Sequence, residues 1–363
     1  DASRLALAAA DGAVSLLKLP TRKYYANANT TPPTLTGHAG SINSVNWSHS
    51  GRLLLLASAD GSASMWDVTH DKPPASPLLR MQNIVQSPVP TAASIGAAGS
   101  GGGAVAAAAG SSSARGSPNN PLFNAEVKDA RFFYLDKLIL LASGSTLHLY
   151  AYSLGQKTPS NDGASRAAEL RHRYKLQHKW HSPSAQSLTC LAAANSFLSP
   201  IVLTAGSDKS IHAIDLGAPG GASIVLTLNE AHERPVHLLR LSEGSAYSEA
   251  PQAAHDLILS ASVDGHVKLW DLRSASCVRK FSAHTNRLHP LGASLSPCLR
   301  YVVAGSEDRS AYLYDAKSGS LIERIKQPPT MDVVSDAAFS PMHPQLALGG
   351  LDGSVRFYSD GGD

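Results

Sequence analysis

The chain repeats one short pattern: an apolar run, a tight turn that contains aspartate, and a second run in which apolar and polar residues alternate. The clearest copy is Asp256–Phe281, DLILSASVDGHVKLWDLRSASCVRKF. Its Asp264-Gly265 pair is typical of a tight turn, because glycine and, less readily, aspartate tolerate a positive φ. After the turn, Val267 and Leu269 alternate with other residues, as in a strand with one buried face. The stretch therefore predicts three antiparallel strands joined by two turns.

The pattern recurs along most of the chain. Further copies are Arg4–Leu19, Leu53–Asp67, Ile201–Asp215, Tyr301–Asp315 and Gln345–Tyr358. The turn residues Asp264, Asp308 and Asp352 are each 44 residues apart. A period of about 40–45 residues in units that end near Trp-Asp is typical of the four-stranded blade of a propeller. The sequence thus predicts an all-β protein built from blades.

With these repeats the chain resembles the WD40-repeat family over nearly all of its length. The resemblance implies a seven-bladed WD40 β-propeller that forms a single domain over residues 1–363. The first blade lacks its inner strand and the last blade its outer strand. In rings of this family the outer strand of the last blade commonly comes from the N-terminal segment, which hides both sheet edges. We therefore expect both missing strands to lie upstream of Asp1.

Several sequence segments point to a particular group within this family. They include EVKDARFFYLDK at Glu126–Lys137, AHERPVH at Ala231–His237 and SLSPCLRYVVAGSEDRSAYLYD at Ser294–Asp315. In this order they resemble the C-terminal propeller of WD-repeat proteins that have two propellers. That group has no established catalytic activity, so the resemblance implies an interaction role.

Two segments interrupt the repeat. Residues 87–121 are of low complexity and rich in Gly, Ser and Ala. Such a composition buries too little apolar surface to offset the entropy of ordering, so we expect a disordered insertion. Residues 155–169 are expected to form a second, irregular insertion.

Charge and cysteine content restrict the function classes. The chain has 31 Lys and Arg against 28 Asp and Glu, a net charge of +3, which demands neither nucleic acid nor a membrane surface. Its three cysteines form no C-x-x-C pair, and the odd count favours a reducing compartment. No apolar run approaches the roughly 20 residues of a membrane-spanning helix. We expect an intracellular, cytoplasmic protein without membrane insertion.

The WD40 resemblance also implies buried polar networks. In such blades a histidine before the inner strand bonds the turn aspartate, and a hydroxyl and a tryptophan complete the set. One network would comprise His38, Ser58, Asp60 and Trp66, and a second His232, Asp264, Trp270 and either Ser260 or Ser262. Because buried polar groups must be satisfied, these residues are expected to stabilise the blades and not to perform chemistry.

The motifs of common enzymes are missing from the sequence. There is no G-x-S-x-G, no G-x-x-x-x-G-K-[ST] and no H-E-x-x-H, and His232-Glu233 is followed by His237 at the wrong spacing. We therefore predict a non-enzyme with no catalytic residue, cofactor, metal or small-molecule substrate.

The stretch Arg171–His181, RHRYKLQHKWH, combines basic residues with Tyr174 and Trp180. One interpretation is an anion or nucleic-acid contact, through phosphate pairing and aromatic stacking. The interpretation we favour is an outer strand whose solvated basic side chains protect a sheet edge. Metal binding by His172, His178 and His181 has less support, because no cysteine or carboxylate lies beside them.

Trp270-Asp271-Leu272-Arg273 matches the W-D-x-R signature of propellers that serve as substrate receptors of cullin-4 ubiquitin ligases. By this resemblance Arg273 would leave the end of a strand and meet a carboxylate of the ligase adaptor. The same four residues are also a common ending of a blade, so the motif alone carries a high risk of a false match.

Other candidate contacts with protein partners lie in the loops that lead into the inner strands. They are Arg234, Asn286, Arg287, His289, Met331 and Asp332. A propeller presents such loops on one face of a rigid ring, which suits several partners at once. The leading function is a non-catalytic protein-interaction scaffold in a large assembly such as a ciliary axoneme, and the alternative is the ligase receptor.

Overall fold

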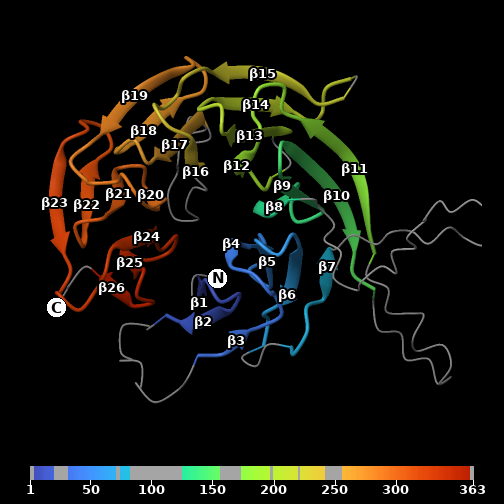
Figure 1. Ribbon diagram of the computed structural model, residues 1–363, viewed down its shortest axis with the longest axis horizontal. Coiled ribbons are helices and arrows are strands. Elements are labelled where there is room, and N and C mark those ends of the chain that lie inside the picture. Colours follow the sequence, from blue (N-terminus) through green and yellow to red (C-terminus); the bar gives the residue numbers. More distant parts are fainter. Residues whose placement is uncertain are drawn as a thin grey trace, which may run out of the picture.

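The computed structural model describes residues 4–19, 32–70, 74–81, 125–155, 173–196, 199–219, 221–241 and 256–359. These residues form seven antiparallel sheets that follow one another around a ring (Figure 1). Five sheets have four strands, and the first and last have three. The prediction of an all-β, seven-bladed propeller is confirmed.

The strands run outward from the centre of the ring within each blade. Blades 1 to 3 consist of β1 (Arg4–Ala8), β2 (Val14–Lys18), β3 (Thr34–Leu35); β4 (Ile42–Trp47), β5 (Leu53–Ser58), β6 (Ala63–Asp67), β7 (Leu79–Met81); and β8 (Val127–Phe133), β9 (Leu138–Ser143), β10 (Thr146–Ser153), β11 (Arg173–His181). Blades 4 and 5 consist of β12 (Leu188–Ala193), β13 (Ile201–Gly206), β14 (Ile211–Asp215), β15 (Ser223–Leu228); and β16 (Val236–Leu241), β17 (Leu257–Ser262), β18 (His266–Asp271), β19 (Ser276–Phe281). Blades 6 and 7 consist of β20 (Ala293–Leu295), β21 (Tyr301–Ser306), β22 (Ser310–Asp315), β23 (Leu321–Lys326); and β24 (Val334–Phe339), β25 (Gln345–Gly350), β26 (Val355–Ser359).

The second strand of each central blade is almost wholly buried. In β5, β13, β17 and β21 every residue after the first is buried. Both faces of such a strand are covered by the neighbouring blades, and for this reason the sequence reads as a continuous apolar run and not as an alternation. Six apolar clusters lie between consecutive blades, from blades 1 and 2 to blades 6 and 7. The core is therefore divided among the interfaces of the ring.

Neighbouring blades are also joined by the inner strands. In the pairing of β4 with β5, a register shift leaves Asn43 without a cross-strand partner, and in the pairing of β16 with β17 the same is true of His237. Each displaced side chain reaches the next blade, because Asn43 Nδ2 donates to the carbonyl of Val127 at 2.9 Å and His237 Nε2 lies 2.8 Å from the carbonyl oxygen of Leu291. A β-bulge re-aims a side chain in this way.

Two strands are unusual in length. The outer strand of blade 3 extends over Arg173–His181, within the basic stretch that was expected to form it. The inner strand of blade 6 is short, Ala293–Leu295, and follows Pro290, which has no N–H to donate to a ladder. Residues 87–121 lie outside the described part of the chain, and of residues 155–169 only Gly155 is described. The two predicted insertions stay predictions.

Candidate functional site

The best-formed polar network lies in blade 5, where the loop before β16 meets the turn between β17 and β18. His232 Nδ1 lies 2.9 Å from Asp264 Oδ2, and His232 Nε2 lies 2.7 Å from Ser260 Oγ. Trp270 Nε1 donates to the same hydroxyl at 2.8 Å. Of the two candidate serines, Ser260 is therefore the one that belongs to the hydrogen-bonded network. Ser262 instead donates to the carbonyls of Arg234 and Pro235.

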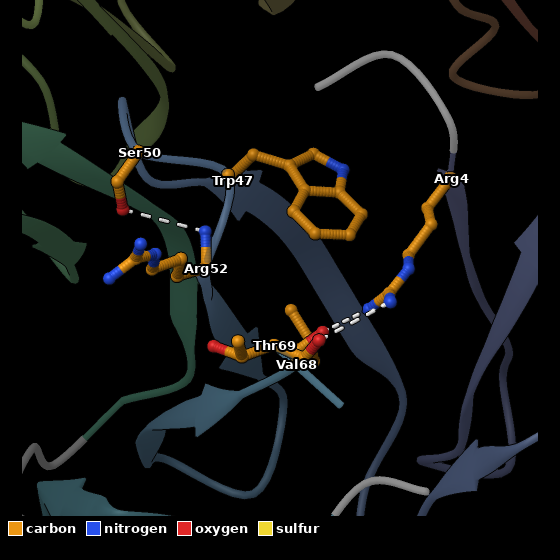
Figure 2. A pocket seen from close by; sticks show the side chains of 7 residues that line it. Arg4, Trp47, Ser50, Arg52, Val68 and Thr69 are labelled. Carbon is orange, nitrogen blue, oxygen red and sulfur yellow. Dashed lines mark hydrogen bonds between the residues drawn. The ribbon is translucent and has the colours of Figure 1, made fainter. Parts of the chain in front are cut away.

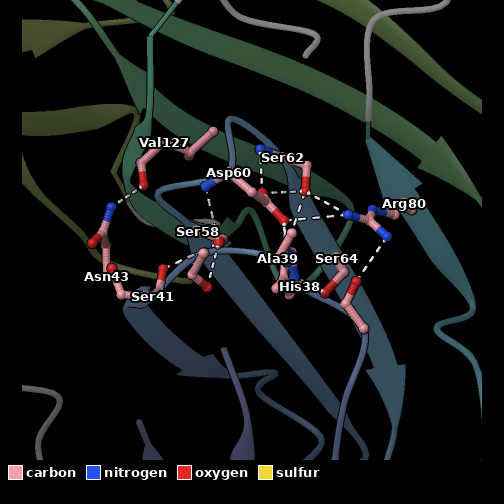
Figure 3. A network of polar contacts seen from close by, with 12 residues as sticks. His38, Ala39, Ser41, Asn43, Ser58, Asp60, Ser62, Ser64, Arg80 and Val127 are labelled. Atoms are coloured by element: carbon pink, nitrogen blue, oxygen red, sulfur yellow. Dashed lines mark hydrogen bonds and ion pairs between the residues drawn. The ribbon is translucent and has the colours of Figure 1, made fainter. Parts of the chain in front are cut away.

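Blade 2 holds a similar network with one change of residue (Figure 3). His38 Nδ1 lies 2.9 Å from Asp60 Oδ2, and His38 Nε2 lies 2.6 Å from Ser64 Oγ, to which Trp66 Nε1 donates at 2.9 Å. The prediction that Ser58 belongs to this network is wrong, because its hydroxyl donates to main-chain carbonyls of the loop before β4.

The change has a simple geometric reason. Ser64 on β6 pairs directly with Leu56 on β5, and Ser260 on β17 pairs directly with Lys268 on β18. Cross-strand partners lie side by side on one face of a sheet. A hydroxyl from either strand of this pair can therefore bridge the histidine and the tryptophan.

An arginine of the outer strand adds a member that the sequence reasoning missed. In blade 2, Arg80 lies 3.2 Å from Asp60 Oδ2 and donates to the carbonyl of Gly37 at 2.8 Å. In blade 6, Arg324 lies 2.7 Å from Asp308 Oδ2. Burial alone would raise the pKa of Asp60, but hydrogen bonds from His38 and Ser62 hold that pKa well below its usual range. The carboxylate therefore stays ionised.

Blade 4 brings serine, histidine and aspartate together in a different way. Asp208 Oδ2 accepts from Ser184 Oγ at 2.5 Å and lies 3.1 Å from His212 Nε2, while His212 Nδ1 lies 3.2 Å from Thr227 Oγ1. A catalytic triad needs the carboxylate and the hydroxyl on opposite ring nitrogens. Here Ser184 donates to the carboxylate itself and lies 3.5 Å from the same nitrogen, so the geometry does not activate Ser184 as a nucleophile. The hydroxyl on the opposite nitrogen is that of Thr227 on the outer strand of the blade.

In blade 6 the histidine of the network has a different partner. His284 Nδ1 lies 3.0 Å from the hydroxyl of Tyr314, and the turn residue Asp308 accepts from the hydroxyl of Tyr312 at 2.7 Å. Burial lowers the pKa of His284 to about 4, so its imidazole is neutral at physiological pH. The networks thus vary from blade to blade: His38 and His232 bond the turn aspartate directly, whereas His284 and Asp308 each bond a tyrosine of β22.

The remaining chemistry-bearing side chains are dispersed. Within the described residues, no three His, Cys, Asp or Glu side chains gather as a metal site would require. Cys190 is buried, and burial raises the pKa of its thiol to about 12, whereas Cys277 and Cys298 are exposed and unbridged. In the same described part, no helix has the length and apolar character needed to cross a membrane.

The predicted partner-contact loops separate into exposed and buried residues. Arg234, Arg287, His289 and Asp332 are exposed. Two of the predicted contact residues are wrong, because Asn286 is 1% exposed and Met331 2% exposed. Met331 packs into the apolar cluster between blades 6 and 7.

The loop around Asn286 is fixed by a carboxylate. Glu307 Oε1 accepts the main-chain N–H groups of Arg287, Leu288 and His289 at 2.9, 2.6 and 3.1 Å. The loop held in this way keeps Asn286 inside and leaves the Leu288 side chain 80% exposed, which the sequence reasoning missed. Such bonds limit the motion of an exposed loop.

Arg273 lies at the other end of the strands, in the turn between β18 and β19. Its side chain is 64% exposed, and it lies 3.3 Å from Asp256 and 3.4 Å from Asp271. Arg273 and the loop residues Arg234 and Arg287 therefore occupy opposite faces of the ring.

The basic stretch forms β11, an outer strand. Trp180 is buried in the cluster between blades 3 and 4, and Tyr174 packs edge-on against Tyr150 with 5.8 Å between ring centroids. Lys175 and Lys179 are exposed. Since the indole points inward, this arrangement fits the edge interpretation better than base stacking; His172 lies outside the described residues.

A small cavity of about 170 Å³ lies between blades 1 and 2, on the same face as Arg273 (Figure 2). It is lined by Arg4, Trp47, Ser50, Gly51, Arg52, Val68 and Thr69. The Arg4 guanidinium donates to the carbonyls of Val68 and Thr69 and so ties blade 1 to blade 2. Among the described residues that line it there is no carboxylate or imidazole, so these residues supply no acid–base pair.

Comparison with known proteins agrees with this architecture. Residues 30–67, 227–271, 275–315 and 321–359 match the family model of the WD domain, G-beta repeat. The chain is 29% identical over 98 residues to Eukaryotic translation initiation factor 3 subunit I of Culex quinquefasciatus, which covers 27% of this chain and 28% of that protein. It is 24% identical over 178 residues to Pre-mRNA-processing factor 19 of Bos taurus, and this match covers 49% of this chain and 32% of that protein.

The chain therefore spans about a third or less of the length of these two relatives. Its fold is similar to the crystal structure of the WD40 beta propeller domain of Doa1, with a TM-score of 0.64, 18% identity, and coverage of 99% of this chain and 90% of that one. The chain thus folds as a seven-bladed β-propeller that is similar to WD40 propellers, and the matched repeats support a relationship to the WD40-repeat family.

Proposed function

We propose that the chain is a non-catalytic scaffold that binds other proteins through the loops beside its turn aspartates. One observation carries the proposal: on this face the buried His232–Asp264 pair is used inside its blade, while exposed side chains surround it. His232 and Asp264 are 0% and 1% exposed, whereas Arg234, Arg287 and His289 face solvent. The face thus offers binding groups on a rigid support and no reactive pair.

The scaffold is proposed to act within a large assembly. One relative is by its name a subunit of a translation initiation factor. For this chain we favour a cytoplasmic assembly such as the ciliary axoneme, and we infer that it is the C-terminal propeller of a two-propeller protein. The phrases at Glu126–Lys137 and Ala231–His237 support this inference, because they resemble WD repeat-containing protein 27.

Co-purification from cells tests the proposal. The tagged chain is compared with the double variant Arg234→Glu, Arg287→Glu and with Lys317→Glu, an exposed lysine in the turn between β22 and β23 on the opposite face. Reversal of charge on the loop face should remove specific partners, while Lys317→Glu should keep them. An identical set of proteins with all three chains would refute binding through these loops.

The second candidate is a substrate receptor of a cullin-4 ubiquitin ligase that docks through Trp270-Asp271-Leu272-Arg273. The observation in its favour is the exposed guanidinium of Arg273 at the end of β18. Against it, Asp256 and Asp271 already flank this cation and would compete with a carboxylate of the adaptor. Direct binding to the purified adaptor distinguishes the two functions.

A further inference from the structure

The outer strands of the blades differ sharply in charge. β11, β15, β19 and β23 lie on the outside of the ring (Figure 1). Among these four, three carry cations: Lys175 and Lys179 on β11, Arg279 and Lys280 on β19, Arg324 and Lys326 on β23. The strand β15 reads SIVLTL and has no charged residue. Charges on an edge strand oppose pairing with another chain, and β15 lacks this protection.

The apolar side chains of β15 are also exposed. Val225 is 54% exposed and Ile224 38% exposed. The register of β14 against β15 skips Val225, just as the register of β22 against β23 skips Ile322, which is 48% exposed. The two strands therefore share the same bulge, each with an exposed β-branched apolar residue in it, and they differ in the charges around it.

We propose that β15 pairs antiparallel with β15 of a second copy of this chain. A two-fold axis places a strand against its own copy, so residue i of one copy faces residue j of the other and residue j faces residue i. For β11 or β19 such pairing would bring cations close to cations, which is unfavourable between opposed residues. For β23 it would bring Glu323, Arg324 and Lys326 of both copies into the contact. For β15 it opposes only apolar and hydroxyl-bearing residues. Of the four strands, β15 is thus the one that can pair with its own copy without a charged side chain in the contact.

The expected association is weak. Six residues on each side bury much less than the roughly 1,600 Å² of a standard protein interface, so two copies should associate only at high concentration. Within a large assembly that brings copies close together, the effective concentration would be high enough. This inference does not depend on which partner the loop face binds.

Sedimentation velocity of the full chain at rising concentration tests the proposal. The wild type should shift from monomer towards dimer, Val225→Lys should stay monomeric, and Ile322→Lys should behave like the wild type. The last variant is the matched control, because it places the same charge in the same bulge of another outer strand. A wild type that stays monomeric, or equal effects of the two variants, would overturn the proposal.

Amide hydrogen exchange of the wild type gives a second measurement that does not rely on a variant folding. The amides of β15 that point away from β14 should exchange more slowly as the concentration rises, while the outward-pointing amides of β19 and β23 should not change. If the outward-pointing amides of β15 are already protected at low concentration in a monomer, another part of the chain covers this edge and the proposal is wrong.

Discussion

His232 and Asp264 form a polar pair with 2.9 Å between Nδ1 and Oδ2, although their side chains are 0% and 1% exposed. A buried carboxylate without a partner is strongly unfavourable, so each residue depends on the other. The main-chain N–H of Glu233 also donates to Asp264, at 3.0 Å. One carboxylate therefore fixes both the histidine and the loop that leads into the inner strand.

Replacement of this carboxylate should destabilise the fold. Asp264→Ala is expected to lower the free energy of unfolding by about 3 kcal/mol, the usual range for one member of a buried pair, because His232 is left without its partner. Urea denaturation measures the change. The control is Asp352→Ala, which removes an exposed turn aspartate bonded to Ser354 and should have a much smaller effect. Equal losses in both variants would contradict the special role of the buried pair.

Stability should also fall as the pH drops below neutrality. Burial lowers the pKa of His284 from its ordinary value of 6.5 to about 4, with a further decrease from His266 and an opposing effect of Asp308 and Asp264. Below pH 6.5 this histidine becomes protonated in the unfolded chain, whereas in the folded chain it becomes protonated only near pH 4. The free energy of unfolding therefore decreases as the pH falls from 6.5 to about 4. His284→Gln should make the pH dependence less steep.

Thermal melts between pH 7 and pH 4.5 check this expectation. The control is His343→Gln, which lies in an exposed turn of blade 7 and should leave the slope as in the wild type. The role assigned to His284 fails if the two variants give the same slope.

The repeat made the fold predictable because its signals are local. An Asp-Gly turn and the apolar run before it lie within a few residues, so the turn at Asp264 and the strand Leu257–Ser262 could be placed from the sequence alone. The networks also involve distant contacts. Arg80 and Arg324 reach aspartates that lie 20 and 16 residues earlier in the chain, across a strand pairing whose register the sequence does not specify.

The network of blade 2 contains Ser64 and not the predicted Ser58, and this difference also depends on contacts between strands. Both serines lie close to Asp60 and on the face of the sheet that carries Trp66, and only the hydrogen bonds show that Ser64 accepts from the indole while Ser58 donates to main-chain carbonyls. The burial of Asn286 likewise depends on the carboxylate of Glu307, about 20 residues away, which fixes the loop around it. The sequence therefore indicated which loop each of these residues belongs to, but not whether its side chain is exposed or buried.

A carboxylate that crosses between blades offers a third test. Asp129 on β8 is 4% exposed, and its Oδ2 accepts the main-chain N–H of Leu191 on β12 at 2.9 Å. Asp129→Ala should lower the free energy of unfolding by about 2 kcal/mol, the penalty for a buried N–H that loses its acceptor. The amide of Leu191 should then exchange faster with solvent.

Blade 7 offers a matched control for this variant. Asp336 has the same local contact as Asp129, because each carboxylate accepts the N–H of the next residue at 2.9 Å, but Asp336 is exposed. Asp336→Ala should therefore cause a clearly smaller loss. A larger loss for Asp336 than for Asp129 would show that the cross-blade bond does not matter.

The two proposed functions use opposite faces of the ring, so one pair of variants separates them. We expect Arg287→Glu to lower the affinity for partners about tenfold or more, since a charge in contact with a partner is reversed, and Arg273→Ala to leave these partners bound. Affinity is measured with the partners recovered by co-purification and with the purified ligase adaptor. Arg273→Lys is the conservative control, because it keeps the charge but loses the planar fork that a carboxylate binds. If the adaptor binds the wild type and is lost with both Arg273 variants while Arg287→Glu changes nothing, the ligase receptor replaces the scaffold as the function of this propeller.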